Sequence, residues 1–241
     1  IKLWKQRSPA KDNVIKINIG GTVKVFKTII LILSVFLAIG YALTLLGVAK
    51  EITISQQSVK FFLIGFGVFL VIWFAGFKRN HFFSTFEHEL THLIMGLLFF
   101  KKITRFHATE DEGGHIALHG SNFLITLAPY FLPTIPLLIL PMFLVINVEF
   151  YKYFYAVLGF FTSYHVFSTL QEFGFHQTDI TKTGKVFSCI FLVFANIVCY
   201  GFLITFVIGG FKYGWLFLKD GFFGSTIWIM WVVNFVKGII K

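Results

Sequence analysis

The sequence predicts an all-α membrane protein, a polytopic helical bundle with about six spans and one further helix that enters the bilayer without crossing it. Of its 241 residues, 56% are hydrophobic and only 13% are charged, and the mean hydropathy is +0.79. In soluble domains about a quarter of the residues are charged. We therefore expect one membrane-embedded domain over residues 25–241, following a basic cytoplasmic flank at residues 1–24.

Long apolar runs mark the predicted spans, since a helix needs roughly 20 apolar residues to cross a bilayer. Five regular runs cover residues 25–47, 59–77, 152–172, 186–209 and 222–236. A sixth run, 122–146, contains Pro129, Pro133, Pro136 and Pro141. Proline removes a backbone donor and kinks a helix, so this run predicts an irregular helix.

The net charge of +10 comes largely from the amino-terminal part of the chain, where residues 1–27 hold seven of the 21 basic residues. This distribution is typical of a cytoplasmic segment next to anionic lipid, and it gives no reason to expect a nucleic-acid partner. Cys189 and Cys199 lie ten residues apart in one apolar run, without a polar partner nearby. We expect neither a disulfide nor a thiolate metal site from them.

Residues 86–99, FEHELTHLIMGLLF, place two histidines and two glutamates in an otherwise apolar helix. His88, Glu89 and His92 fit the pattern H-E-x-x-H, whose histidines stand on one helix face and can bind one Zn²⁺. Glu89 can then accept a proton from zinc-bound water. The alternative is a polar seam in which the histidines pair with each other and with Glu87 or Glu89. Ionisable groups inside a membrane segment favour the functional interpretation.

Catalytic zinc usually has three protein ligands and a water, so another part of the chain must supply the third ligand. The candidates are Asp179, Glu172, His176, His165, His115 and His119. A carboxylate suits a water-activating site with two histidines, which favours Asp179 or Glu172.

These features resemble the membrane-embedded zinc metalloproteases of the site-2 protease type, in particular their compact bacterial members. The resemblance covers residues 80–190 and rests on HELTH in an apolar helix, the hairpin residues Gly113-Gly114-His115, the pair Ala128-Pro129, and the acid in HQTDITKTG. It implies a bacterial plasma-membrane endopeptidase that cleaves a transmembrane protein or peptide.

The resemblance also implies residue roles. Zinc is held by His88, His92 and Asp179, and Glu89 is the general base. Ile180 follows Asp179 where the family commonly has glycine. Glu172 and His176 therefore stay as rival third ligands.

Residues 101–120 form the most polar interior stretch and predict a short β-hairpin or a loop. In an extended strand, His115, Ala117 and His119 would share one face. A strand edge beside a protease site can pair with an unwound substrate, which makes Gly114, His115 and Ala117 the predicted substrate-binding residues. A solvated loop without a catalytic part is the alternative.

Topology favours a motif helix that returns to the face it entered. If every apolar run crosses fully, the histidine motif begins at the cytoplasmic face while Asp179 falls on the opposite side. If residues 81–100 re-enter instead, Asp179 returns to the side of His88. The re-entrant arrangement leaves only five of the 21 basic residues off the cytoplasmic side, which agrees with the positive-inside bias.

Two other functions stay open at this stage. A non-catalytic zinc-binding scaffold, or a subunit of a membrane complex, needs the ligands but no turnover. A di-iron membrane oxygenase also uses many histidines, and His115 and His119 add a second H-x-x-x-H pattern. Such oxygenases usually need more clustered histidines than this chain offers.

The re-entrant arrangement predicts that positions 12 and 102 lie on the same face of the membrane. Single cysteines at these positions should react with a membrane-impermeant maleimide from the same side of sealed vesicles. Labelling from opposite sides would rule the arrangement out.

Overall fold

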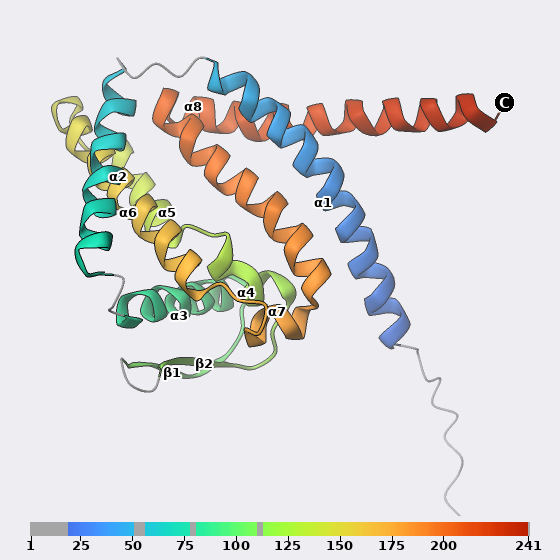
Figure 1. Ribbon diagram of the computed structural model, residues 1–241, viewed down its shortest axis with the longest axis horizontal. Coiled ribbons are helices and arrows are strands. Elements are labelled where there is room, and N and C mark those ends of the chain that lie inside the picture. The colour runs from blue at the N-terminus through green and yellow to red at the C-terminus, as the bar shows by residue number, and fades with distance from the viewer. Residues whose placement is uncertain (1–18, 51–55, 78–80, 110–112, 241) are drawn as a thin grey trace, which may run out of the picture.

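The computed structural model describes residues 19–50, 56–77, 81–109 and 113–240, which form a helical bundle with one two-stranded β-hairpin (Figure 1). The α-helices are α1 (Ile19–Ala49), α2 (Gln57–Ala75), α3 (His81–Leu98), α4 (Phe123–Leu127), α5 (Thr134–Ile139), α6 (Tyr151–Glu172), α7 (Thr178–Thr183) and α8 (Lys185–Ile240). Three short 3₁₀ helices are η2 (Ala128–Tyr130), η3 (Leu140–Leu144) and η4 (Val148–Phe150). The strands are β1 (Ile103–Thr109) and β2 (Gly113–Leu118).

Three of the described helices, α1, α2 and α8, are long and apolar enough to cross a membrane. The segments Phe123–Tyr130 and Thr134–Leu144 make a fourth candidate if they are counted together, although they are bent by 93°. This bend confirms the irregular helix expected from the prolines. The chain thus has the helices of a membrane protein, while the predicted count of six spans is not confirmed.

Two helices explain the lower count. In α6 the buried face carries hydroxyl and imidazole groups, including those of Thr162, His165 and Ser168, which make the helix less apolar. In α8 the predicted spans 186–209 and 222–236 belong to one helix with non-helical backbone angles at Gly209 and Gly210. Beyond this break, α8 turns and runs across one end of the bundle (Figure 1).

Helices α2 and α6 pack backbone to backbone through two glycines. A Cβ atom on Gly65 would overlap the carbonyl oxygen of Ala156, and one on Gly159 would overlap the carbonyl oxygen of Phe62. This close approach places α6 firmly against α2. It also fixes the height of the polar face of α6 relative to the motif helix.

The motif helix α3 lies across the end of the bundle opposite the terminal part of α8, and it does not run alongside α2 and α6 (Figure 1). The hairpin packs along α3, and α7 lies at this same end. The first residues of α1 are there as well. One end of the bundle therefore gathers every segment that the sequence associates with the site.

The glycine contact predicts a position-specific loss of stability. Gly65→Ala should lower the free energy of unfolding by about 1–3 kcal/mol, because the added methyl group meets backbone atoms that cannot move aside. Gly67→Ala is the matched control on the same helix, since nothing lies within 4 Å of its Cβ position. The control should be neutral or stabilising by up to about 1 kcal/mol. Unfolding in detergent measures both variants, and equal effects would contradict the packing.

Candidate metal centre

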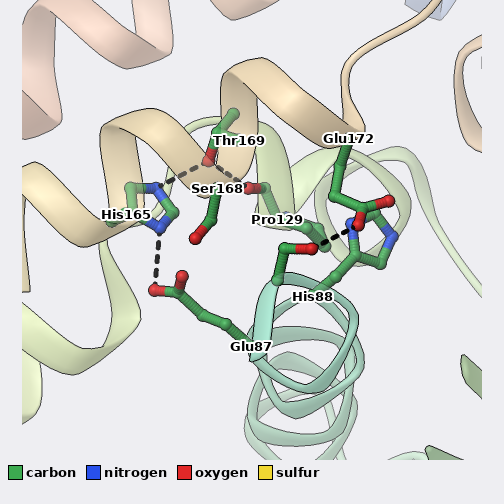
Figure 2. Close-up of a pocket in the computed structure, with 8 residues that line it drawn as sticks. Glu87, His88, Pro129, His165, Ser168, Thr169 and Glu172 are labelled. Atoms are coloured by element: carbon green, nitrogen blue, oxygen red, sulfur yellow. Dashed lines mark hydrogen bonds and ion pairs between the residues drawn. The ribbon is translucent and has the colours of Figure 1, made fainter. Parts of the chain in front are cut away.

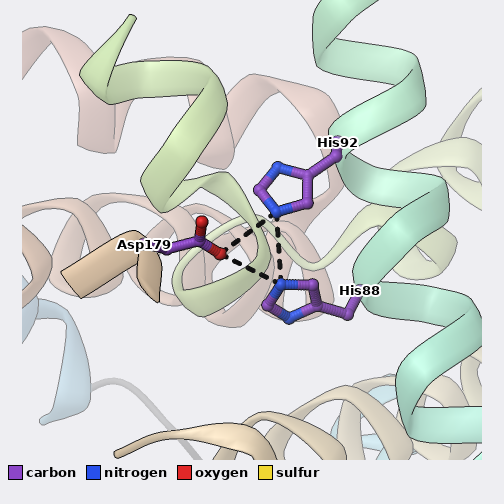
Figure 3. A group of neighbouring side chains, drawn as sticks. All are labelled: His88, His92 and Asp179. Carbon is purple, nitrogen blue, oxygen red and sulfur yellow. Dashed lines mark hydrogen bonds and ion pairs between the residues drawn. The ribbon is translucent and has the colours of Figure 1, made fainter. Parts of the chain in front are cut away.

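His88 and His92 of α3 meet Asp179 of α7 at one point (Figure 3). The Nε2 atoms of the two histidines lie 3.2 Å apart. The Oδ2 atom of Asp179 lies 3.3 Å from the first of these nitrogens and 3.2 Å from the second. Among the described residues, these three side chains are the group of His, Cys, Asp or Glu residues that could hold a metal ion.

The triangle of ligand atoms has the size that a tetrahedral metal ion requires. With metal–ligand bonds of about 2.0–2.1 Å, tetrahedral geometry separates neighbouring ligand atoms by roughly 3.3 Å. The three atoms therefore match one face of such a tetrahedron. Two imidazoles and one carboxylate leave the fourth position for a water or a substrate atom.

His92 is held in the tautomer that a metal needs. Its Nδ1–H donates to the carbonyl oxygen of Ile125 at 2.9 Å, which leaves the Nε2 lone pair directed at the site. Ile125 belongs to the first turn of α4, where its own N–H donates to the side chain of the N-cap residue Asn122 at 2.9 Å. The cap of α4 thus positions the acceptor that orients His92.

Asp179 is positioned by the short helix α7. Its neighbour Ile180 is fully buried in an apolar cluster with residues of η2 and α8. The Lys27 ammonium of α1 donates to the carbonyl oxygen of Thr183 at 2.8 Å, at the carboxyl end of α7. Gly184 then leaves the helix with a φ of +103°, a conformation that favours glycine.

The two histidines favour the ionised form of the Asp179 carboxyl. Burial alone would raise the pKa of this group, but the hydrogen bonds and charges of His88 and His92 outweigh burial and hold its pKa well below the usual range. Asp179 is therefore an acceptor for a proton-bearing imidazole or a ligand for a cation. Both roles keep the two helices together.

The structure also shows which group pairs with Glu87. Its carboxylate is buried and pairs with Nδ1 of His165 on α6 at 2.9 Å, as Figure 2 shows. Thr91, the buried residue inside the H-E-x-x-H pattern, lies 2.7 Å from the hydroxyl of Thr134. These contacts attach α3 to α6 and α5, and they give His165 a structural partner in place of a metal.

The other third-ligand candidates lie outside the metal group. Glu172 accepts a hydrogen bond from the Ser84 hydroxyl at 2.7 Å (Figure 2). His176 and His119 are exposed, and neither belongs to the group. The side chain of His115 lies outside the described residues. Of the two carboxylates that the pattern left open, the geometry selects Asp179.

Glu89 is buried beside the first metal ligand in sequence. Its place in the H-E-x-x-H pattern, directly after His88, is the one that a general base occupies.

Tyr130 is a residue of the site that the sequence did not indicate. Its ring packs edge-on against His88, with 5.2 Å between ring centroids. Its hydroxyl is buried and has no hydrogen-bond partner. An orphaned buried hydroxyl costs roughly 1–3 kcal/mol. No local sequence pattern indicates a functional role for this tyrosine. It follows Ala128-Pro129 in an apolar run, in which an aromatic residue is expected to pack in the core.

The hairpin brings the predicted substrate-binding residues next to α3. In β2, the residues Gly114, His115 and Ala117 pair with Ala108, His107 and Arg105 of β1 in antiparallel register. The predicted hairpin is thus present as backbone. The side chains of residues 105–118 lie outside the described residues, so their part in binding stays a prediction.

Comparison with known protein families, with curated proteins and with solved structures found no match.

The geometry predicts which acid controls metal binding. Asp179→Ala and His92→Ala should each lower the bound metal at least tenfold, because each removes one corner of the ligand triangle. Glu172→Ala is the matched control, since its carboxylate binds Ser84 instead. Elemental analysis of the detergent-purified protein measures metal per chain. Metal lost in Glu172→Ala but kept in Asp179→Ala would show that the ligand set is wrong.

Proposed function

We propose that this protein is an intramembrane zinc-dependent endopeptidase, which hydrolyses a peptide bond within or next to a membrane-spanning segment of its substrate. The observation that carries the proposal is the meeting of His88, His92 and Asp179 at one end of an apolar bundle, with Glu89 beside the first ligand. Two imidazoles, one carboxylate and an adjacent glutamate are the donor set of hydrolytic zinc sites.

Each residue has a role in this chemistry. A zinc ion held by the three ligands would supply a nucleophilic water and polarise the scissile carbonyl. Glu89 takes the proton of the attacking water and delivers it to the leaving amine. His92, fixed by Ile125, presents its unprotonated nitrogen without reorganisation. Asp179 contributes a negative charge that stabilises the ligand set.

The position of α3 supports the proposed membrane orientation. The end of the bundle that carries α3, the hairpin and α7 also carries the start of α1, which follows the basic flank. Under the positive-inside bias this end faces the cytoplasm of a bacterial plasma membrane. In this proposal α3 is the re-entrant helix and α6 is a further span, whereas the terminal part of α8 lies across the opposite end of the bundle, so the spans number fewer than the six that the sequence predicts.

The hairpin supports a mode of substrate presentation. A membrane-spanning helix shields its peptide bonds within its own hydrogen bonds, so it must unwind before water can attack. The sheet has two strands, and each strand keeps an outer edge. Because the hairpin packs along α3, an unwound substrate paired with this edge near Gly114, His115 and Ala117 lies next to the site.

Cleavage of a synthetic transmembrane peptide in detergent tests this function. Glu89→Gln should lower the rate by roughly 10²–10⁴-fold with metal content unchanged, because the base is lost while the ligands remain. Glu149→Gln, at an exposed position of η4, is the matched control and should cleave normally.

The same measurement separates the alternatives. Zinc retained by an intact chain that leaves every peptide of a substrate panel whole would favour the non-catalytic scaffold. Two irons per chain would favour the oxygenase, which needs a second group of ligands. The described residues contain one such group.

A further inference from the structure

Helices α6 and α8 border a groove of about 450 Å³ whose lining includes Tyr130, the residue that packs against His88 of the metal centre. We define the α6–α8 groove by six of its lining residues, Tyr130, Val166, Leu170, Phe173, Leu192 and Val193. Most of this lining is apolar. Leu170 and Val193 are largely exposed, so the groove opens on the outer surface of the bundle.

Tyr130 joins the groove to the metal centre and is held on three sides. Its carbonyl oxygen accepts a hydrogen bond from the Asn196 side chain of α8 at 3.1 Å. Its ring packs edge-on against His88 on one side and Phe173 on the other. The backbone and the ring of Tyr130 are thus held in place, and its buried hydroxyl is the polar group that has no partner.

The ring that carries this hydroxyl contacts His88, so the hydroxyl belongs to a residue that borders the ligand set. A phenol is protonated at neutral pH and donates one hydrogen bond. Preorganised donors beside a hydrolytic centre stabilise the negative charge that develops on a carbonyl oxygen.

We infer that the α6–α8 groove binds a bulky apolar side chain of the substrate next to the scissile bond, and that the Tyr130 hydroxyl donates a hydrogen bond to the carbonyl oxygen of that bond. The inference rests on the proposed endopeptidase function. Water adds to the carbonyl carbon, the C–N bond breaks, and the products are a carboxylate and an amine. Glu89 moves the proton, while Tyr130 keeps its own.

A peptide fits the groove better than a lipid does. The groove is mainly apolar, and one of its lining residues, Tyr130, has a hydroxyl without a partner. An unwound apolar peptide brings both a large side chain and a carbonyl oxygen within one residue. The hydrocarbon part of a lipid fills the apolar groove but has no acceptor along its length for the buried hydroxyl.

Tyr130→Phe tests the donor, because it removes the hydroxyl and keeps the ring packing. We expect kcat for the synthetic peptide to fall roughly 100-fold, with KM within about threefold of the wild type and metal content unchanged. Tyr155→Phe is the matched control, since this buried tyrosine belongs to an apolar cluster of α2, α6 and α8 away from the site. Equal kcat in wild type and Tyr130→Phe would overturn the role of the hydroxyl.

Val193→Trp tests the groove by filling its open side. It should lower kcat/KM at least tenfold for a peptide with phenylalanine beside the scissile bond, and less than threefold for the same peptide with alanine there. Val157→Trp places the same change at an exposed position of α6 outside the groove and should alter neither value. An unchanged ratio would overturn the pocket. An acyl lipid found by native mass spectrometry in wild type and lost in Val193→Trp would assign the groove to lipid.

These outcomes separate the two proposals. Cleavage by the wild type that is unaffected in Tyr130→Phe and Val193→Trp refutes this inference and leaves the endopeptidase in place. A wild-type chain that binds zinc and cleaves no peptide of the panel refutes both.

Discussion

The rest of the structure depends on bringing three ligand atoms from α3 and α7 to within 3.3 Å of one another in an apolar bundle. Asp179 stands 87 residues beyond His92 in the sequence, so this meeting cannot be local. It requires that α3 and α7 lie at the same end of the bundle. The chain meets the requirement by placing α3 across that end and by ending α6 at Glu172, a few residues before α7 (Figure 1).

Two carboxylates that join α3 to its neighbours, those of Asp179 and Glu87, are paired with imidazoles. A carboxylate in an apolar environment is costly unless it is paired and hydrogen-bonded, and removing its partner leaves that cost exposed. Asp179 faces two imidazoles, and Glu87 faces His165. Helices α3 and α7 are joined by groups that can also hold a metal. Helices α3 and α6 are joined by Glu87 and His165, which are both buried. This division gives Glu87, the first of the two motif glutamates, a role in joining α3 to α6.

Sequence reasoning predicted what depends on composition and spacing. The helical membrane class, the irregular run 122–146, the hairpin and the pairing of His88 with His92 follow from periodicity and from the i, i+4 rule. The sequence could only narrow the third ligand to a carboxylate, because the choice between Asp179 and Glu172 depends on which one faces α3 after α6 has ended. Ile180 decides this, since its full burial anchors α7 and turns Asp179 toward the histidines. The number of spans and the presence of Tyr130 at the site could not be predicted from the sequence. Both depend on tertiary structure, namely on where a helix breaks and on which hydroxyl is buried without a partner.

A hydrolytic site inside a membrane protein needs both water and an apolar substrate, and the geometry offers them different routes. The side chains of His88 and Asp179 are 14% and 20% exposed, whereas that of His92 is 10% exposed. The metal centre is therefore partly open to solvent, mainly at Asp179 and His88. The α6–α8 groove opens on the apolar flank at Val193 and Leu170, and its lining includes Tyr130, which packs against His88. A substrate side chain that enters this groove from the flank therefore lies next to a residue that contacts the ligand set.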